Sequence, residues 1–444
     1  MARTWKMITV AACFSGLSIV SSSRAVDFTW TAGPDVLVPL LNSQDADIGI
    51  IQDGAQLSVQ TALEQTWPRY LGTSLDNLVR QPDAKRDASF TQPNGDDVHW
   101  TNGMWQDSTG KRFAIVHIES NYAVPRTPFL WKRRIGLATS VDRGAHWHFE
   151  GDIITPHPKR TGAPSSASDF QDFGCGDTYL YVDRRGEYFY LYYMTAWVQA
   201  KTGWRTKQTM SVARAPISGK MAPGQWKKWH GGTWNEPGLG GHETAVFRGT
   251  EKTEGTDAAV VHFNTYLNTF VVIGHDSTGA AWINTAGDLA KQNWGTVDYR
   301  FPRRLYWYNW PIDPITNDRY EIGQTFRLYS AQANVKGNGT KYFNVTLSRN
   351  GNAGPTAHLI QPEENAGNYP SGGLTLIATA SDADGTVAKV EFFANHEKIG
   401  ELTARPYLFH WKNVPPGSYR LSVKSTDNTG AATQSAGVYI NVTR

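Results

Sequence analysis

Paired runs of apolar residues recur along most of the chain, and each pair is joined by a short polar turn. In the clearest pair, Phe173–Trp197, the residues Tyr, Phe, Leu and Val crowd two arms around the turn at 183–186. This composition predicts two antiparallel strands. The stretches Val98–Ile118 and Thr244–Ile273 have the same form. We therefore expect a series of β-hairpins.

The hairpins belong to a longer repeat. About four repeats of roughly sixty to eighty residues can be followed up to residue 350. In the segment before residue 90 we expect strands at 35–41 and 48–51, a short helix within 60–71, and an outer strand that closes the last repeat. The pattern predicts an all-β fold, with a five-bladed β-propeller over residues 26–350.

A turn motif, S-x-D-x-G-x-x-W, occupies Ser140–Trp147. In such a turn the Asp accepts backbone N–H groups, the Gly allows a tight reversal, and the Trp packs under the hairpin. The motif resembles the Asp boxes of sialidase-type propellers. That resemblance implies a structural role in a blade and no catalytic one.

The pattern changes after a Gly- and Asn-rich linker at 348–354. Short alternating strands are predicted at Leu374–Ala378, Lys389–Phe393 and Tyr419–Ser425, among others. About seven short strands in under about a hundred residues indicate an immunoglobulin-like β-sandwich over residues 355–444.

Composition and charge limit the function and the compartment. The chain has 444 residues with 17 Trp, 19 Tyr and 18 Phe, and its net charge is only +3. Without a basic stripe, nucleic acid is not an expected partner. Residues 1–25 have the charged start, apolar segment and small-residue cleavage site of a signal peptide, which predicts a secreted, extracellular or periplasmic bacterial protein. No later apolar run is long enough to span a membrane.

Cys175 is the one cysteine outside the predicted signal peptide, so no intramolecular disulfide is expected. A nucleophilic role would suit a lone cysteine. A small buried residue beside a strand is the simpler interpretation, and we adopt it.

The C-terminal domain resembles the bacterial immunoglobulin-like modules of secreted polysaccharide-degrading enzymes. The likeness rests on A-x-A-S-D-A-D-G-T-V-A-K-V-E-F-F at Ala378–Phe393, P-G-S-Y at Pro416–Tyr419 and S-T-D-N-T-G-A at Ser425–Ala431. It implies a spacer or binding role for this domain.

An acid stands before each of the three hairpins, and this pattern resembles the five-bladed propellers of family 43 glycoside hydrolases. The resemblance implies an Asp base on the first inner strand, an Asp that tunes the acid on the second, and a Glu acid on the third. These positions correspond here to Asp97, Asp177 and Glu243. Asp96 and Asp35 remain rivals for the base.

An inverting glycosidase needs a carboxylate base that activates water and a carboxylic acid that protonates the leaving oxygen, about 6.5–9.5 Å apart. We therefore predict a hydrolase of plant or algal polysaccharides of the arabinan or xylan type, acting as a monomer with no required cofactor and no catalytic metal. A calcium or other ion in the channel is compatible with this fold. Aromatic and basic side chains near strand starts are candidates for sugar subsites, with core packing or surface ion pairing as the alternative: His99, Trp100, His242, Trp307, Trp310 and Arg327.

Two other functions stay open. A polysaccharide lyase would need a His or Tyr base and a cation beside a uronate, for which His99, His242, Tyr192 or Tyr308 could serve. A secreted glycan-binding propeller would need no catalytic acid. The sequence lacks the H-E-x-x-H, G-x-S-x-G and P-loop motifs, so metalloprotease, serine hydrolase and nucleotide-binding functions have no support.

Overall fold

The computed structural model describes most of the chain, namely residues 28–38, 41, 45–54, 56–63, 66–91, 97–120, 132–158, 170–199, 205–247, 256–276, 279–295, 304–305, 308–331, 340–349, 352, 354–363, 368–382, 385–395 and 397–443. These residues form β-strands and two short 3-10 helices, η2 (Ala88–Phe90) and η4 (Ile217–Gly219). In these ranges no helix has the length and apolar character that crossing a bilayer requires.

The first three blades follow one another along the chain as antiparallel meanders. Blade 1 consists of β3 (Gly49–Asp53), β4 (Gln56–Gln60), β5 (Arg69–Gly72) and β6 (Val79–Gln81). Blade 2 consists of β8 (Val98–Gln106), β9 (Arg112–Ser120), β10 (Lys132–Ser140) and β11 (His146–Ile154), with β7 (Lys85–Arg86) parallel to β11. Blade 3 consists of β12 (Phe170–Asp183), β13 (Tyr188–Gln199), β14 (Arg205–Pro216), β15 (Lys227–His230) and β16 (Thr233–Pro237).

The last two blades are linked by an exchanged strand. Blade 4 consists of β17 (Thr256–Asn264), β18 (Thr269–Asp276) and β19 (Ala281–Ala286), and β21 (Glu321–Ile322) joins β17 in parallel. Blade 5 consists of β20 (Tyr308–Ile312), β22 (Thr325–Ala331), β23 (Lys341–Arg349) and β1 (Phe28–Ala32), with β2 (Val36–Leu37) also on β23. The N-terminal strand β1 therefore forms the outer edge of the last blade, which confirms the predicted closure.

The five inner strands follow one another in blade order, and four neighbouring pairs are in direct contact. β3 contacts β8, β8 contacts β12, β12 contacts β17, and β17 contacts β20. Blades 5 and 1 meet where Arg327 Nη1 on β22 binds Asp76 Oδ1 at 2.7 Å. Apolar side chains from all five sheets form one continuous core. The predicted five-bladed propeller is confirmed. The predicted helix within 60–71 is wrong, because β4 ends at Gln60, β5 starts at Arg69, and the described residues between them are not helical.

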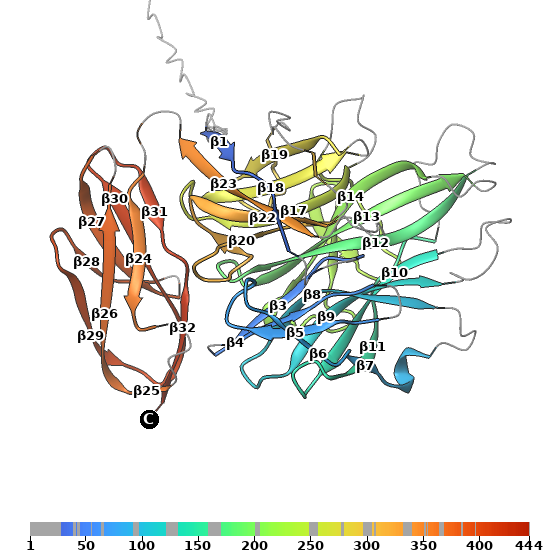
Figure 1. Cartoon of the computed structure of the whole chain (residues 1–444), viewed down its shortest axis with the longest axis horizontal. Helices are drawn as coiled ribbons and strands as arrows, with labels where there is room; N and C mark the ends of the chain where they lie inside the picture. The colour runs from blue at the N-terminus through green and yellow to red at the C-terminus, as the bar shows by residue number, and fades with distance from the viewer. Residues whose placement is uncertain are drawn as a thin grey trace, which may run out of the picture.

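The C-terminal domain is a β-sandwich that lies beside the propeller (Figure 1). One sheet has the order β24 (Thr356–Gln361), β26 (Gly372–Ser381), β29 (Tyr407–Val414). The other has the order β25 (Asn368–Pro370), β32 (Val438–Thr443), β30 (Gly417–Asp427), β27 (Val387–Ala394), β28 (Glu397–Leu402), with β31 (Ala432–Gln434) on β30. The sandwich has its own apolar core, as the alternating pattern predicts.

The predicted Asp-box turn is present between β10 and β11. Asp142 Oδ1 accepts the backbone N–H of His146 at 2.9 Å, and Ser140 Oγ accepts that of Gly144 at the same distance. Trp147 is buried beneath the turn, where its Nε1 donates to the Gly144 carbonyl at 3.0 Å. Cys175 is also fully buried, as we expected for a small core residue.

His262 on β17 is a buried base that should weaken the propeller in acid. Its ring lies 5.7 Å from that of Phe326 on β22, between blades 4 and 5, and neither ring nitrogen has a hydrogen-bond partner among the described residues. Burial lowers its pKa to about 3. In the unfolded chain this histidine binds a proton near pH 6.5, whereas in the folded protein it stays neutral until about pH 3. The free energy of unfolding therefore falls as pH drops from 6.5 towards 3.

We expect His262→Leu to remove this loss. Compared with the parent protein, the variant should lose about 3 kcal/mol less unfolding free energy between pH 7 and pH 4, as measured by urea denaturation at both values. The matched control is His358→Leu on the exposed face of β24, which should follow the parent curve. Equal acid sensitivity of His262→Leu and the parent would contradict the prediction.

Candidate active site

Side chains from four blades meet beside the first half of β12. We call this group the carboxylate cluster. It contains one residue that precedes β3, two from β9, and one each from β10, β12 and β20. In chain order its members are Asp45, His117, Glu119, Arg133, Asp177 and Tyr308.

Asp177 is fixed by contacts on every side. Its Oδ2 accepts from Arg133 Nη1 at 2.8 Å, and its Oδ1 accepts from Tyr308 Oη at 3.3 Å. Its backbone N–H donates to His117 Nδ1 at 3.1 Å. The residue has a positive φ of 45° and lies where the β12–β13 register shifts. Such a backbone is uncommon for a non-glycine residue and is found where a site needs one defined orientation.

Two glycines allow this arrangement. Gly174 has φ of 95°, and a Cβ there would lie 2.2 Å from the carbonyl oxygen of Arg133. A Cβ on Gly176 would lie 2.8 Å from the His117 ring. β10 and β12 can therefore touch only because the residues on either side of Cys175 lack side chains. The sequence G-C-G-D is thus a requirement of the close approach beside Asp177.

Glu119 binds the guanidinium group of Arg133. Its Oε1 accepts from Arg133 Nε at 2.7 Å and lies 3.2 Å from His117 Nε2. Burial would raise the pKa of Glu119, but the charges of Arg133 and His117 outweigh this effect and lower it to about 2. Glu119 is therefore a fixed negative charge, and Arg133 is shared between two carboxylates.

Asp45 is the one member of the cluster that reaches the surface, since the other five are buried. Its backbone N–H donates to the carbonyl of Ala62 at 2.9 Å. Burial, followed by the negative charges of Asp177 and Glu119, raises the pKa of Asp45 to about 7. A carboxyl group with a pKa near neutrality can exchange protons at working pH, as general acid–base catalysis requires.

Tyr308 has the opposite character. Burial, together with the charges of Asp177 and Asp45, raises its pKa well above the ordinary value. The phenol therefore stays protonated and serves as a hydrogen-bond donor to Asp177.

Asp97 lies on the other side of β10 from the cluster. Its Oδ2 accepts from Arg134 Nη2 at 2.6 Å, and Arg134 Nε also binds Asp152 Oδ1 at 3.0 Å. Arg133 and Arg134 are neighbours on one strand, so their side chains point to opposite faces. The structure thus brings Asp177 into the cluster and leaves Asp97 outside it. Asp96 lies outside the described residues, and Asp35 lies beside β2 on the outer part of blade 5.

Glu243 lies at the outer edge of blade 3. The hairpin expected to follow it begins only at β17, so Glu243 does not stand at the start of an inner strand. The chain just after it pairs with β14, because Val246 N–H donates to the carbonyl of Met210 at 2.8 Å. Glu243 Oε2 accepts from Lys228 Nζ at 2.7 Å. The ammonium of Lys228 is fully buried and also binds the carbonyls of Thr155 and Gly241, each at 2.8 Å.

The predicted subsite residues are dispersed. Trp100 is buried with its ring 5.3 Å from that of His117, so it packs against the cluster. His99 is buried on the other side of β8, where burial and the charge of Arg86 lower its pKa to about 4. His242 stacks on His157 near Glu243, with ring centroids 3.7 Å apart.

The remaining three have other surroundings. Trp310 is fully buried and stacks on Tyr329 at 5.6 Å, which makes it a core residue. Arg327 forms the contact with Asp76 that links blades 5 and 1, and its guanidinium lies over the ring of Tyr342. Trp307 lies outside the described residues.

Sequence reasoning missed Asp45, His117, Glu119 and Arg133. The signal for Asp45 was present, because D-A-D directly precedes the apolar run at 48–51, which was itself expected to be a strand. The other three come from second and third strands of a blade, where no local pattern distinguishes them from structural residues. Among the described residues, no three His, Cys, Asp or Glu side chains are arranged to hold a metal ion.

Comparison with known proteins supports the domain at the C-terminus. Residues 355–423 match the family model of the bacterial Ig domain. The predicted immunoglobulin-like sandwich is thereby confirmed. No curated protein matches the chain.

Several solved structures resemble the chain. One is a family 117 glycoside hydrolase from the marine bacterium Zobellia galactanivorans, with 9% identity, 73% of this chain and 90% of that chain covered, and a TM-score of 0.41. Another is an exo-beta-1,3-galactanase from Phanerochaete chrysosporium, with 12% identity, 92% and 94% covered, and a TM-score of 0.39. A third is an endo-arabinase from Bacteroides thetaiotaomicron, with 12% identity, 70% and 95% covered, and a TM-score of 0.38. At these values the likeness carries no argument about activity, which has to come from the site itself.

Proposed function

We propose that the protein is a secreted glycoside hydrolase that cleaves a plant or algal polysaccharide with inversion, and that Asp45 is its general base. The observation that carries this proposal is the partly exposed Asp45 carboxyl group, with a pKa of about 7, beside two buried carboxylates near the inner strands. Asp45 precedes β3, the first inner strand, which is where the family 43 resemblance expects the base.

The chemistry follows from these protonation states. Ionised Asp45 takes a proton from a water molecule, the water oxygen bonds to the anomeric carbon, and the glycosidic C–O bond breaks. Burial, followed by the negative charges of Asp177 and Glu119, raises the pKa of Asp45, which makes it a stronger base than an ordinary aspartate. Arg133 keeps both buried carboxylates in place.

The leaving oxygen needs a proton from a second carboxyl group. The sequence assigns this role to Glu243, and that assignment stays a prediction. Its contacts with Lys228 favour a structural role instead. Glu251 and Glu254 precede β17 in the sequence and lie outside the described residues. Changing Glu243, Glu251 and Glu254 to Gln in turn distinguishes the candidates, because only loss of the true acid should abolish hydrolysis of a substrate with a poor leaving group.

A lyase is disfavoured by the same cluster. Its base would have to be Tyr308 or His117, and the raised pKa of Tyr308 makes it a poor proton acceptor. Arg133, the cation nearest to them, is occupied by Glu119 and Asp177, so it is not available to neutralise a uronate. The other candidates, His99, His242 and Tyr192, lie outside the carboxylate cluster, and Tyr192 is buried against the rings of Phe247 and Trp294.

The experiment that tests the function is incubation of the purified protein with a panel of plant and algal polysaccharides. Reducing ends and ultraviolet absorbance of unsaturated uronates are recorded together. The proposal expects new reducing ends without the absorbance. Both signals together would show a lyase, and binding without either would show a glycan-binding propeller.

A further inference from the structure

A short segment of blade 5, Asp313–Gly323, crosses to the centre of the propeller. We call it the plug. Its strand β21 lies on the edge of β17 that β18 does not occupy, with Phe263 opposite Glu321. Because β17 is an inner strand, this edge faces the propeller axis. The plug therefore closes part of the channel from within.

Three consecutive residues of the plug contact all four of the remaining blades. Arg319 reaches blade 1, where its Nη2 binds both carboxylate oxygens of Asp47 at 2.8 and 3.0 Å. Tyr320 Oη donates to the carbonyl of Met104 on blade 2, and its own carbonyl accepts from Phe263 on blade 4. Glu321 Oε1 accepts from Arg185 Nε of blade 3 at 3.3 Å.

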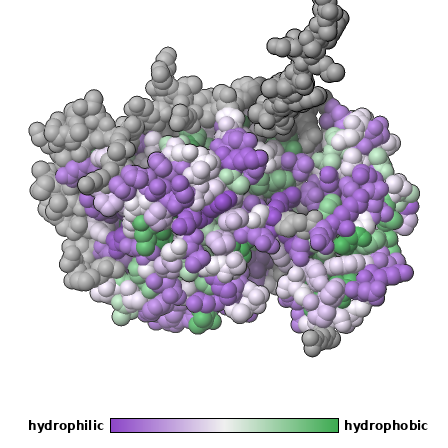
Figure 2. All heavy atoms as spheres, turned by 180° about the vertical axis from the view of Figure 1, so that it is seen from behind, coloured by the Kyte–Doolittle hydropathy of each residue, from purple (hydrophilic) through white to green (hydrophobic). Residues whose placement is uncertain are grey.

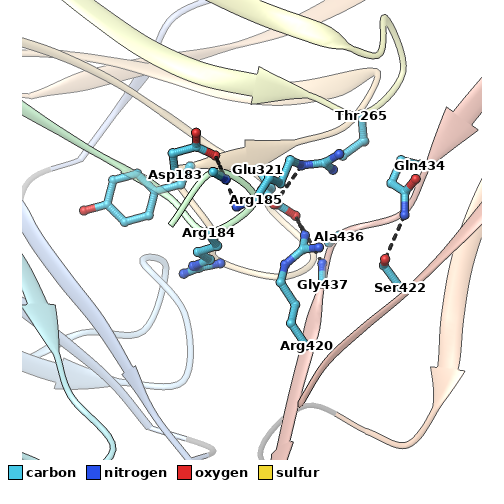
Figure 3. Close-up of polar contacts among 12 residues, drawn as sticks. Asp183, Arg184, Arg185, Thr265, Glu321, Arg420, Ser422, Gln434, Ala436 and Gly437 are labelled. Carbon is cyan, nitrogen blue, oxygen red and sulfur yellow. Dashed lines mark hydrogen bonds and ion pairs between the residues drawn. The ribbon is translucent and has the colours of Figure 1, made fainter. Parts of the chain in front are cut away.

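The other carboxylate oxygen of Glu321 belongs to the Ig-like domain. Glu321 Oε2 accepts from Arg420 Nη2 on β30 and from the backbone N–H of Gly437 at 3.2 Å (Figure 3). Nearby, Arg184 binds Asp318 at 2.5 Å and lies over the ring of Tyr439 on β32, 5.1 Å from its centroid. The sandwich is thus joined to the plug by charged groups from both domains.

This junction is buried, which makes it energetically demanding. The Glu321 and Arg420 side chains are only 1% and 6% exposed. A Cβ on Gly437 would lie 2.2 Å from Arg420 Nε, so a glycine is needed for the arginine to reach its partner. A buried charge left without its partner is strongly destabilising, so separating the domains is opposed at this contact. On the outer face seen in Figure 2, the hydrophobic residues form only small separate groups among polar ones.

Arg319 of the plug supports the segment that carries Asp45. Asp47 is two residues further along and fully buried. Besides the bonds from Arg319 Nη2, two hydrogen bonds fix Asp47 and a third fixes the next residue. Asp47 N–H donates to Asn102 Oδ1 at 3.0 Å, Ile48 N–H donates to Asp47 Oδ1 at 2.9 Å, and Arg319 Nη1 binds the Ile48 carbonyl. The position of the Asp45 carboxylate therefore depends on where Arg319 holds Asp47.

We propose that the Ig-like domain contributes to catalysis by positioning Asp45. Arg420 of this domain acts on Asp45 through Glu321 and Arg319. This inference rests on the proposed role of Asp45. Arg420, Glu321 and Arg319 are positioning residues that touch no substrate. The domain is then more than the spacer or binding module that its sequence suggests.

The test uses the full chain and the variant Arg420→Met. Hydrogen exchange of the backbone amides of Asp45, Asp47 and Ile48, measured by mass spectrometry, should become faster by about tenfold or more, although these residues lie in the other domain. On the polysaccharide selected by the panel, kcat should fall by about tenfold to a hundredfold while KM changes little, since a displaced base slows chemistry and leaves binding intact. In Arg420→Lys, which keeps the positive charge, both the exchange rates and kcat should lie closer to the values of the parent protein.

The matched control is Lys398→Met in the same domain, which removes the two ion pairs of this exposed lysine, with Glu391 and with Glu401. It should change neither readout. If Arg420→Met does not fold, Glu321→Gln keeps the shape of the acid and gives the same test. Unchanged exchange at residues 45–48 in a folded variant would overturn the coupling. Faster exchange together with a fully active Asp45→Asn would keep the coupling and overturn the proposed function.

Discussion

Replacing Asp45 with Asn is expected to lower kcat/KM by about 10²- to 10⁴-fold, the usual contribution of a positioned general base. The amide keeps the shape of the side chain but cannot take a proton from water. Because Asp45 is partly exposed and its described backbone contact to Ala62 is unaffected, the fold should survive. The measurement is steady-state kinetics on the polysaccharide that the panel identifies, with circular dichroism as a check of folding.

The matched control for this variant is Asp97→Asn. Asp97 also precedes an inner strand, but its partner is Arg134 on the face of β10 that points away from the cluster. Its loss should change kcat/KM by less than about tenfold. An inactive Asp97→Asn protein beside an active Asp45→Asn protein would reverse the assignment and restore the sequence-based choice of base.

Replacing Lys228 with Met is expected to destabilise the propeller by about 3–5 kcal/mol, because Glu243 then keeps a buried charge without its partner. The ammonium also binds the carbonyls of Thr155 and Gly241, so blade 2, blade 3 and the chain leading to blade 4 all lose a contact. Urea unfolding followed by tryptophan fluorescence measures the loss.

The double variant Lys228→Met with Glu243→Met separates the causes of this loss. It should recover more than half of it, since no unpaired carboxylate remains and only the two carbonyls are left without a donor. A double variant that is no more stable than Lys228→Met would show that the ion pair contributes little. That result would weaken the structural role of Glu243 and would support the predicted role of Glu243 as the acid.

The sequence predicted the architecture well because strand pairing leaves a local pattern. Phe173–Trp197 crowds aromatic and β-branched residues around a polar turn, and it forms the hairpin of β12 and β13. The S-x-D-x-G-x-x-W motif is a set of short-range hydrogen bonds, so it could be recognised without knowledge of the fold. The wrong helix within 60–71 shows the limit of this reasoning, because short strands such as β5 are stabilised by their neighbours in the sheet rather than by their own sequence.

The candidate site was harder to predict, because it depends on which blade comes first. Taking Val98–Ile118 as the first hairpin made Asp97 the natural base. The structure has a complete blade before it, and under the proposed function the base is therefore Asp45, which precedes the inner strand of that blade. Asp177 was predicted from the same pattern and does lie in the cluster. Glu119 and Arg133 could not be found this way, because their partners are distant in the sequence and only folding brings them together.

The pH dependence of kcat/KM tests the central claim, that Asp45 is a base tuned by neighbouring carboxylates, most directly. For the parent protein we expect activity to rise with pH through an ionisation near 7, because Asp45 works only when it is ionised. In Glu119→Gln one of the charges that raise this pKa is gone, so the rising limb should move to lower pH. A parent limb near the ordinary aspartate value of about 4, or a limb that does not move in Glu119→Gln, would contradict the account.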